Sequence, residues 1–196
     1  MSKSDPASKS EKLKNIKWVI TIFLVTIVVS GVISLVSDEV MSDSGIVAAF
    51  LILLAIILIG ILFDVVGVAV TSADESPFHS MAARKVPGAQ EAIRLLRKAE
   101  RVSSICNDVV GDICGVISGS AAATISVQLL QNFTFTWPKV ISLVMSAFVA
   151  GLTVGGKAIG KGFAVNSSTN IVYFVGKMIY TMSRIPNIFF KQKTER

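Results

Sequence analysis

Residues 46–72 read IVAAFLILLAIILIGILFDVVGVAVTS, an apolar run in which Asp64 is the only charged residue. An α-helix rises about 1.5 Å per residue, so about 20 apolar residues cross the hydrocarbon core of a bilayer. This run is long enough to cross it with some tilt. It therefore predicts a membrane-spanning helix.

Three more apolar windows have the length of a membrane span, at about residues 16–36, 105–130 and 139–156. The chain of 196 residues is 52% hydrophobic and only 16% charged, whereas a soluble domain has roughly 25% charged residues. We therefore predict an all-α membrane protein with four transmembrane helices, in a transmembrane domain over residues 16–190. Residues 1–15 are polar and predict a disordered cytoplasmic tail, and residues 191–196 form a basic C-terminal tail.

Two amphipathic juxtamembrane helices are expected beside these spans, over residues 78–102 and 164–188. In the first, AQEAIRLLRKAERV (Ala89–Val102) places apolar residues at helical spacing with basic residues between them, and Pro87-Gly88 breaks it from a short preceding helix around Phe78–Lys85. In the second, IVYFVGKMIYTM (Ile171–Met182) is apolar but short, and Lys177 interrupts it. This pattern favours an interfacial helix over a fifth span.

The basic residues indicate the orientation, because cytoplasmic loops of membrane proteins carry an excess of Lys and Arg. In the four-span arrangement every basic residue except Lys139 falls on one side, in the segments Lys3–Lys17, Arg84–Arg101 and Lys157–Arg196. We therefore expect a multi-pass protein of the plasma membrane with both termini in the cytoplasm. Because the net charge of +6 lies beside the spans, the expected partners are anionic membrane lipids and not nucleic acid.

Three carboxylates lie at membrane depth: Asp64 in the second span, and Asp108 and Asp112 in the third. An ionised carboxylate near the bilayer centre costs about 2.5–3.5 kcal/mol on insertion scales, so such residues mark functional sites by default. All three acids, and Lys157 at the end of the fourth span, belong to the inner half of the membrane. A purely structural interpretation stays open, in which Asp108 caps its helix and Asp112 pairs with Lys157.

Neutral oxygens accompany these acids at Asn107 and Ser72. Carboxylate, amide and hydroxyl oxygens together suit a hard cation such as Mg²⁺. Lys157 would then be a charge-compensating residue beside the candidate metal ligands, which are Asp64, Asp108, Asp112, Asn107 and Ser72. No Walker loop, HExxH or GxSxG pattern occurs, and His79 is the only histidine, so an enzyme is not expected.

Glycines recur at every fourth position in the last two spans, at Gly111, Gly115 and Gly119 and at Gly151 and Gly155. Small residues at this spacing let the backbones of two membrane helices approach closely. They predict a compact bundle and a seam for a homodimer.

The order of segments from about Ile46 to Ile188 resembles the transmembrane domain of the CorB/CNNM (cyclin-M) family, whose members are associated with magnesium transport. The stretch VAVTSADESPFHSMAARKVPGAQEAIRLLRKAERV (Val68–Val102) is similar to the segment that follows the family's first helix. GGKAIGKGFA (Gly155–Ala164) is similar to its Gly-Glu-x-x-Pro-Lys-x-x-Ala stretch, with Lys161 and Ala164 matching. The resemblance implies magnesium as the ligand and a belt-like amphipathic helix after the last span.

The chain departs from the family pattern at charged positions. The family's Ser-x-Ser-Glu motif falls on Asp64-Val65-Val66-Gly67, so the Glu is lost and an acid stands at Asp64 instead. The Glu of Gly-Glu falls on Lys157, which reverses the charge, and the Pro falls on Gly160. The paired nucleotide-binding CBS domains of the family do not follow within this sequence, and the first span is an addition.

Two classes of function follow from these observations. In the first, the chain is a divalent-cation transport protein that works as a homodimer, with magnesium as the expected ion. In the alternative, it is a membrane interaction or scaffold protein that conducts nothing, in which Lys157 takes the place of the bound cation. A holin-like pore-former is a third hypothesis, which the short length and the basic tail permit.

Overall fold

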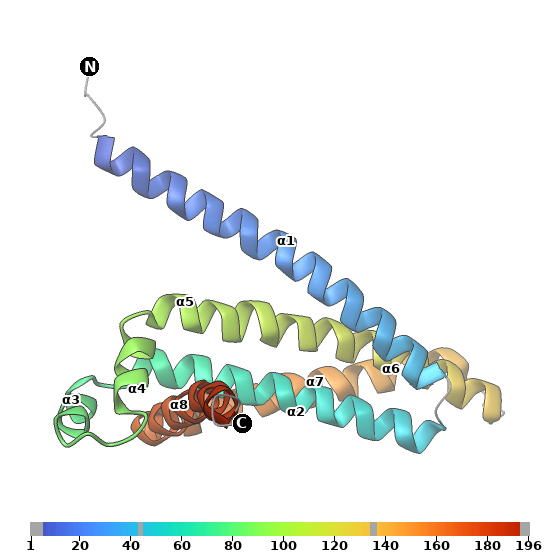
Figure 1. Cartoon of the computed structure of the whole chain (residues 1–196). Coiled ribbons are helices and arrows are strands. Elements are labelled where there is room, and N and C mark those ends of the chain that lie inside the picture. Colours follow the sequence, from blue (N-terminus) through green and yellow to red (C-terminus); the bar gives the residue numbers. More distant parts are fainter. Residues whose placement is uncertain (1–5, 43–44, 134–136, 193–196) are drawn as a thin grey trace.

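The chain is mostly helical in the part that its structure describes. A computed structural model describes residues 6–42, 45–133 and 137–192, is 91% helical and holds no strand in that part. Four helices are long and apolar enough to cross a membrane, which confirms the predicted all-α class and the four candidate spans (Figure 1). In chain order the elements are α1 (Pro6–Ser42), α2 (Ile46–Ser72), α3 (Ser76–Ala83), α4 (Ala89–Leu96), α5 (Ala99–Ser104), the π-helix η1 (Ile105–Gly111), α6 (Asp112–Asn132), α7 (Pro138–Asn166) and α8 (Ser168–Gln192).

The first and third spans are longer than their predicted bounds. α1 begins at Pro6, so residues 6–15, which were expected to be a disordered tail, are helical. Residues 1–5 and 193–196 of the two predicted tails lie outside the described residues. The third span is a continuous helical rod from Ala99 to Asn132, because α5, η1 and α6 follow one another without a break.

α7 also runs past its predicted end at Gly156. Its last turns contain no proline, and the helix ends only at Asn166, before the cap residue Ser167 with a φ of −114° and a ψ of 19°. α8 then begins at Ser168 and contains residues 168–188 of the second predicted juxtamembrane helix, whose first residues belong to α7. Lys157 and Lys161 therefore project from a continuous candidate span and not from a loop.

α2 is the centre of the bundle, because it packs against α6, α7, η1 and α8. α1 rests on the bundle through contacts such as the hydrogen bond that Gln128 Nε2 donates to the Met41 carbonyl at 2.8 Å. Its first turns extend away from the other helices (Figure 1). Near the α1–α2 connection, the helices bury a hydrophobic core of Met41, Ala49, Leu53, Ile57, Ala121, Ala122, Ile125 and Val149.

Glycines make the closest helix contacts, but at other positions than the predicted ones. A methyl group built on Gly156 or Gly160 of α7 would overlap Ile61 or Val65 of α2, so these two helices approach closely. Nothing lies within 4 Å of a methyl group built on four of the glycines predicted to pack, Gly115, Gly119, Gly151 and Gly155. Those glycine faces are open in the single chain, and the homodimer seam stays a prediction.

The other end of the bundle, called the basic end below, consists of α3, α4, α5, α8 and the last turns of α2 and α7. The predicted helix over residues 78–102 is divided here into α3, α4 and α5. These elements bury a second core, formed by Ala69, Val70, Phe78, Ala92, Ile93, Leu96, Ala164 and Val172. α4 therefore turns its apolar face towards protein, although its amphipathic pattern suggested a face towards the membrane interface.

α4 and α8 meet backbone to backbone at the basic end. Gly88 precedes α4 with a φ of 88°, a left-handed conformation that glycine adopts without strain. Its carbonyl oxygen would lie 2.6 Å from a methyl group built on Gly176 of α8. The absence of a side chain at Gly176 therefore lets α8 lie directly against α4.

Replacement of Gly176 by alanine is expected to destabilise the detergent-purified protein by about 1–3 kcal/mol, because the new methyl group would overlap the Gly88 carbonyl. Gly162→Ala is the matched control, since nothing lies within 4 Å of a methyl group built there on α7. The control change should leave stability unchanged or raise it by up to about 1 kcal/mol through helix propensity. Equal melting temperatures for the two variants would contradict the close contact between α4 and α8.

Candidate functional site

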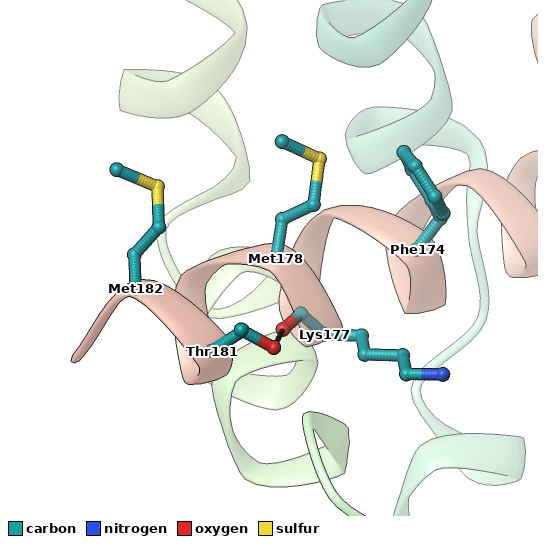
Figure 2. Close-up of a pocket in the computed structure, with 5 residues that line it drawn as sticks. All are labelled: Phe174, Lys177, Met178, Thr181 and Met182. Atoms are coloured by element: carbon teal, nitrogen blue, oxygen red, sulfur yellow. Dashed lines mark hydrogen bonds between the residues drawn. The ribbon is translucent and has the colours of Figure 1, made fainter. Parts of the chain in front are cut away.

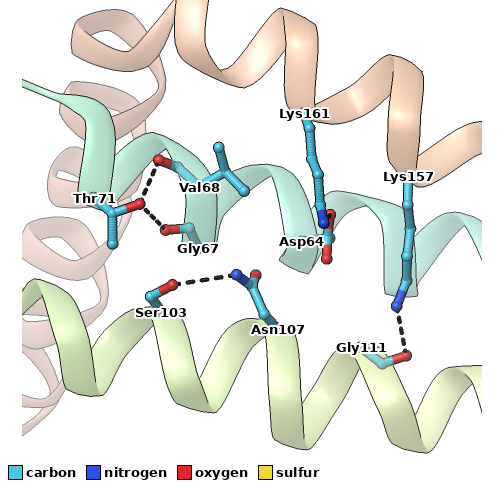
Figure 3. A network of polar contacts seen from close by, with 9 residues as sticks. All are labelled: Asp64, Gly67, Val68, Thr71, Ser103, Asn107, Gly111, Lys157 and Lys161. Atoms are coloured by element: carbon cyan, nitrogen blue, oxygen red, sulfur yellow. Dashed lines mark hydrogen bonds and ion pairs between the residues drawn. The ribbon is translucent and has the colours of Figure 1, made fainter.

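Among the charged residues whose side-chain burial the structure describes, Asp64 is the only buried one, with 3% of its surface exposed. It lies in α2 where this helix faces η1 on one side and the last turns of α7 on the other (Figure 3). A carboxylate inside a membrane span is costly unless neighbouring groups compensate its charge. The surroundings of Asp64 are therefore the candidate functional site.

The third span changes from α-helix to π-helix beside Asp64. Over η1 the backbone N–H of residue i+5 bonds to the carbonyl of residue i, which adds a residue to the turn. The Asn107 carboxamide projects from this turn towards Gly67 of α2 (Figure 3), and a methyl group on Gly67 would overlap it. Gly67 therefore provides the room that the Asn107 side chain needs.

Asn107 is only partly satisfied in this position. Its Nδ2 donates a hydrogen bond to Ser103 Oγ at 3.2 Å. Its Oδ1 is buried without a hydrogen-bond donor, and the same is true of Asp64 Oδ2. Most buried acceptors in native proteins have a donor, so these two oxygens are acceptors that a further group could satisfy.

Two lysines from one face of α7 reach into this region, because Lys157 and Lys161 are one helical turn apart (Figure 3). Lys157 Nζ donates a hydrogen bond to the Gly111 carbonyl at 3.2 Å. Lys161 Nζ lies 3.9 Å from Asp64 Oδ2. A carbonyl at the end of the π-helix and the buried carboxylate therefore each have one ammonium group beside them.

The cluster of Asp64, Lys157 and Lys161 carries more positive than negative charge. At 3.9 Å the Lys161 ammonium group forms an ion pair with Asp64 but no hydrogen bond. The Lys161 side chain is 55% exposed and that of Asp64 only 5%, so the pair is open on the lysine side. A divalent cation at this place would meet the charge of both ammonium groups, and Coulomb repulsion disfavours it while they stay there.

The structure brings part of the predicted site together. Asp64, Asn107 and Lys157 lie at the junction of α2, η1 and α7 (Figure 3). The remaining predicted ligands are exposed, namely Asp108, Asp112 and Ser72. Across the described ranges 6–42, 45–133 and 137–192, no group of three or more Asp, Glu, His or Cys is placed to hold a metal ion. The full set of candidate ligands is therefore not assembled in the single chain.

The helical geometry of the third span explains why some predicted site residues lie at the junction and others are exposed. Successive residues of a helix point roughly 100° apart, so a turn that directs Asn107 towards Gly67 directs Asp108 elsewhere. Lys157 binds the backbone carbonyl of Gly111 and forms no ion pair with the neighbouring Asp112. The interpretation that paired Asp112 with Lys157 is therefore wrong.

Two parts of the site were not expected from the sequence. Lys161 was noted in the sequence only as a match to the family stretch and not as a site residue. Its four-residue spacing from Lys157 nevertheless places both lysines on one helix face. The π-helix over ICNDVVG (Ile105–Gly111) has no comparable signal, because its residues also suit an α-helix. The first feature could have been found from spacing, and the second required the tertiary structure.

Comparisons with known proteins assign no family to this chain. It matches no protein-family model, and no curated protein is significantly similar to it. The resemblance to the CorB/CNNM family therefore stays a hypothesis, and the chemistry of the site has to be argued from its own geometry.

Lys161→Gln is expected to lower the free energy of unfolding by about 1–3 kcal/mol, because it leaves the buried Asp64 carboxylate without its ion pair. The lower part of this range is expected, since more than half of the Lys161 side chain is exposed. In an Asp64→Asn background, Lys161→Gln should lower the free energy of unfolding by much less. Thermal unfolding of all four proteins in this double-mutant cycle measures the coupling, and strictly additive effects would argue against the ion pair.

Proposed function

We propose that this protein is a membrane interaction protein that conducts no ion, and that Lys157 is a fixed cation inside it. The observation that carries the proposal is the hydrogen bond from Lys157 Nζ to the Gly111 carbonyl, in the same region as the buried Asp64. In the stretch of the chain that resembles CorB/CNNM domains, Lys157 takes the position of the Glu in the family's Gly-Glu motif. The charge at this position is reversed, so a tethered ammonium group replaces a mobile cation.

The surroundings of Lys157 support a permanent place for its ammonium group. A methyl group built on Gly111 would lie 3.3 Å from Lys157 Nζ, so the missing side chain lets the ammonium group come close. Lys161 compensates the charge of Asp64 from the next turn of the same helix. Both ammonium groups are covalently part of α7 and cannot cross the membrane as a transported ion does.

The basic end of the protein is the proposed partner surface, on the cytoplasmic side of the plasma membrane. Exposed cationic side chains are concentrated there, at Arg84, Lys85, Arg94, Arg97 and Lys98. None of them forms an ion pair with another described residue. Cationic groups at a membrane surface attract acidic groups, so we expect an acidic segment of a membrane partner to bind here.

Divalent-cation transport is the second candidate, with magnesium as the expected ion. The two buried oxygens without donors, Asp64 Oδ2 and Asn107 Oδ1, favour it, because hard cations bind carboxylate and amide oxygens. This function requires both α7 lysines to withdraw from the site. It also requires further oxygens, from Asp108 and Asp112 after a rearrangement of the third span or from a second copy of the chain.

Thermal unfolding against Mg²⁺ concentration separates these two functions. A ligand that binds only the native state stabilises it by about 2.7 kcal/mol at a hundredfold excess over Kd. If Lys157 occupies the place of the cation, the wild-type protein in detergent is expected to show no specific stabilisation by Mg²⁺. Lys157→Glu, which puts an acid at the position of the family's Glu, is expected to create a response to Mg²⁺.

Lys98→Glu is the control for this experiment, since it makes the same charge change at an exposed position of the basic end. It should stay as unresponsive to Mg²⁺ as the wild type. Stabilisation of the wild-type protein by Mg²⁺ that Asp64→Asn abolishes would overturn the proposal. That result would support cation transport, and ion flux into liposomes would then be the next measurement.

A further inference from the structure

α8 lies across the basic end of the bundle, at a steep angle to α2 and α7 (Figure 1). It has 25 residues but is not among the described helices that are apolar enough to cross a membrane. One side of α8 is held by protein, because Val172 and Gly176 are buried and the helix packs against α4 and α2. A helix that is too polar to cross a membrane and is held against one end of the bundle is expected to lie in the plane of the membrane surface.

The other side of α8 presents an apolar stripe, defined by Phe174, Met178 and Met182 on successive helical turns. These residues are 63%, 49% and 65% exposed, respectively. Figure 2 shows the three side chains projecting from the same side of the helix, with Lys177 extending from a different side. Together with Lys177 and Thr181 they line a hollow of about 370 Å³.

Lys177 joins this stripe to the basic end. Its Cα would lie 2.6 Å from a methyl group built on Gly88, so its backbone is fixed against the start of α4. Its ammonium group forms no ion pair with another described residue. The Thr181 hydroxyl donates to the Lys177 backbone carbonyl at 2.9 Å. Lys177 is the cationic residue among those that line the hollow.

α4 provides an informative contrast, because it has a comparable amphipathic sequence. Its apolar residues Ala92, Ile93 and Leu96 are buried inside the protein, so α4 keeps no apolar stripe for lipid. α8 exposes its stripe, and an apolar surface beside a fixed cation complements a molecule with a hydrocarbon chain and an anionic headgroup.

We propose that α8 binds an anionic phospholipid of the leaflet at the basic end. An acyl chain lies along Phe174, Met178 and Met182, and the headgroup phosphate pairs with the Lys177 ammonium group. The inference is independent of the proposed function, because it uses no residue of the Asp64 site. A failure of one therefore leaves the other standing.

The test titrates the full-length protein in neutral detergent with phosphatidylglycerol, phosphatidylcholine or glycerol phosphate, and the shift in melting temperature gives an apparent Kd. Phosphatidylglycerol is expected to stabilise the protein, phosphatidylcholine to do so much less, and glycerol phosphate not at all. Lys177→Gln should weaken phosphatidylglycerol binding about fivefold, as expected for one basic residue at a membrane surface. Met178→Ser should weaken it about tenfold, because the acyl chain loses apolar contact area.

Lys98→Gln is the matched control, since Lys98 is exposed at the same end but lies outside the hollow. It should leave the apparent Kd unchanged. An equal loss with Lys98→Gln and Lys177→Gln would mean diffuse attraction by the basic end and would overturn the proposal. If phosphatidylcholine or glycerol phosphate bound as tightly as phosphatidylglycerol, the proposal would also be overturned. The same holds if Met178→Ser changed the oligomeric state but left the apparent Kd for phosphatidylglycerol unchanged.

Discussion

The buried carboxylate of Asp64 is the constraint on which the arrangement of the spans depends. An ionised acid in the hydrocarbon region is tolerated only when a cation, a hydrogen-bond donor or a water-filled space compensates it. α7 brings the cation, because it continues as a helix past Gly156 and carries Lys161 to 3.9 Å from Asp64. This approach is possible because Gly156 and Gly160 let α7 lie directly on Ile61 and Val65 of α2.

The π-helix η1 packs against α2 on the side opposite to α7, next to the buried Asp64. η1 ends at Gly111, and the carbonyl of this residue accepts a hydrogen bond from Lys157. The wide turn also directs Asn107 into the space left by Gly67. Two cations, one acid and one amide therefore share a small volume, with Asp64 Oδ2 and Asn107 Oδ1 left without donors. The acid is compensated by Lys161, and the two oxygens that accept no hydrogen bond are the groups of this site that a bound cation would use.

The basic end shows how amphipathic helices with similar sequence patterns reach different surroundings. α4 is short and follows a left-handed Gly88, so it folds back and buries Ile93 and Leu96 among α2, α3 and α8. α8 is much longer, and its contact through Gly176 covers only one of its sides. The opposite side, with Phe174 and Met178, is exposed. At this end α8, which contains the predicted interfacial segment Ile171–Met182, therefore exposes an apolar side, whereas α4 does not.

The sequence by itself determined the class of the fold and the four candidate spans, because lipid offers no hydrogen bonds and a long apolar segment must satisfy its backbone as a helix. It also singled out Asp64, Asp108, Asp112 and Lys157 as charged residues expected in one layer of the membrane, with Asn107 as a neighbouring oxygen ligand. Only the tertiary structure decided that Lys157 contacts the Gly111 carbonyl, that Asp108 and Asp112 are exposed, and which glycines pack. The physical reason is that one extra residue in a turn rotates the following side chains by roughly 100°, and hydropathy averaged along the chain does not detect such a rotation.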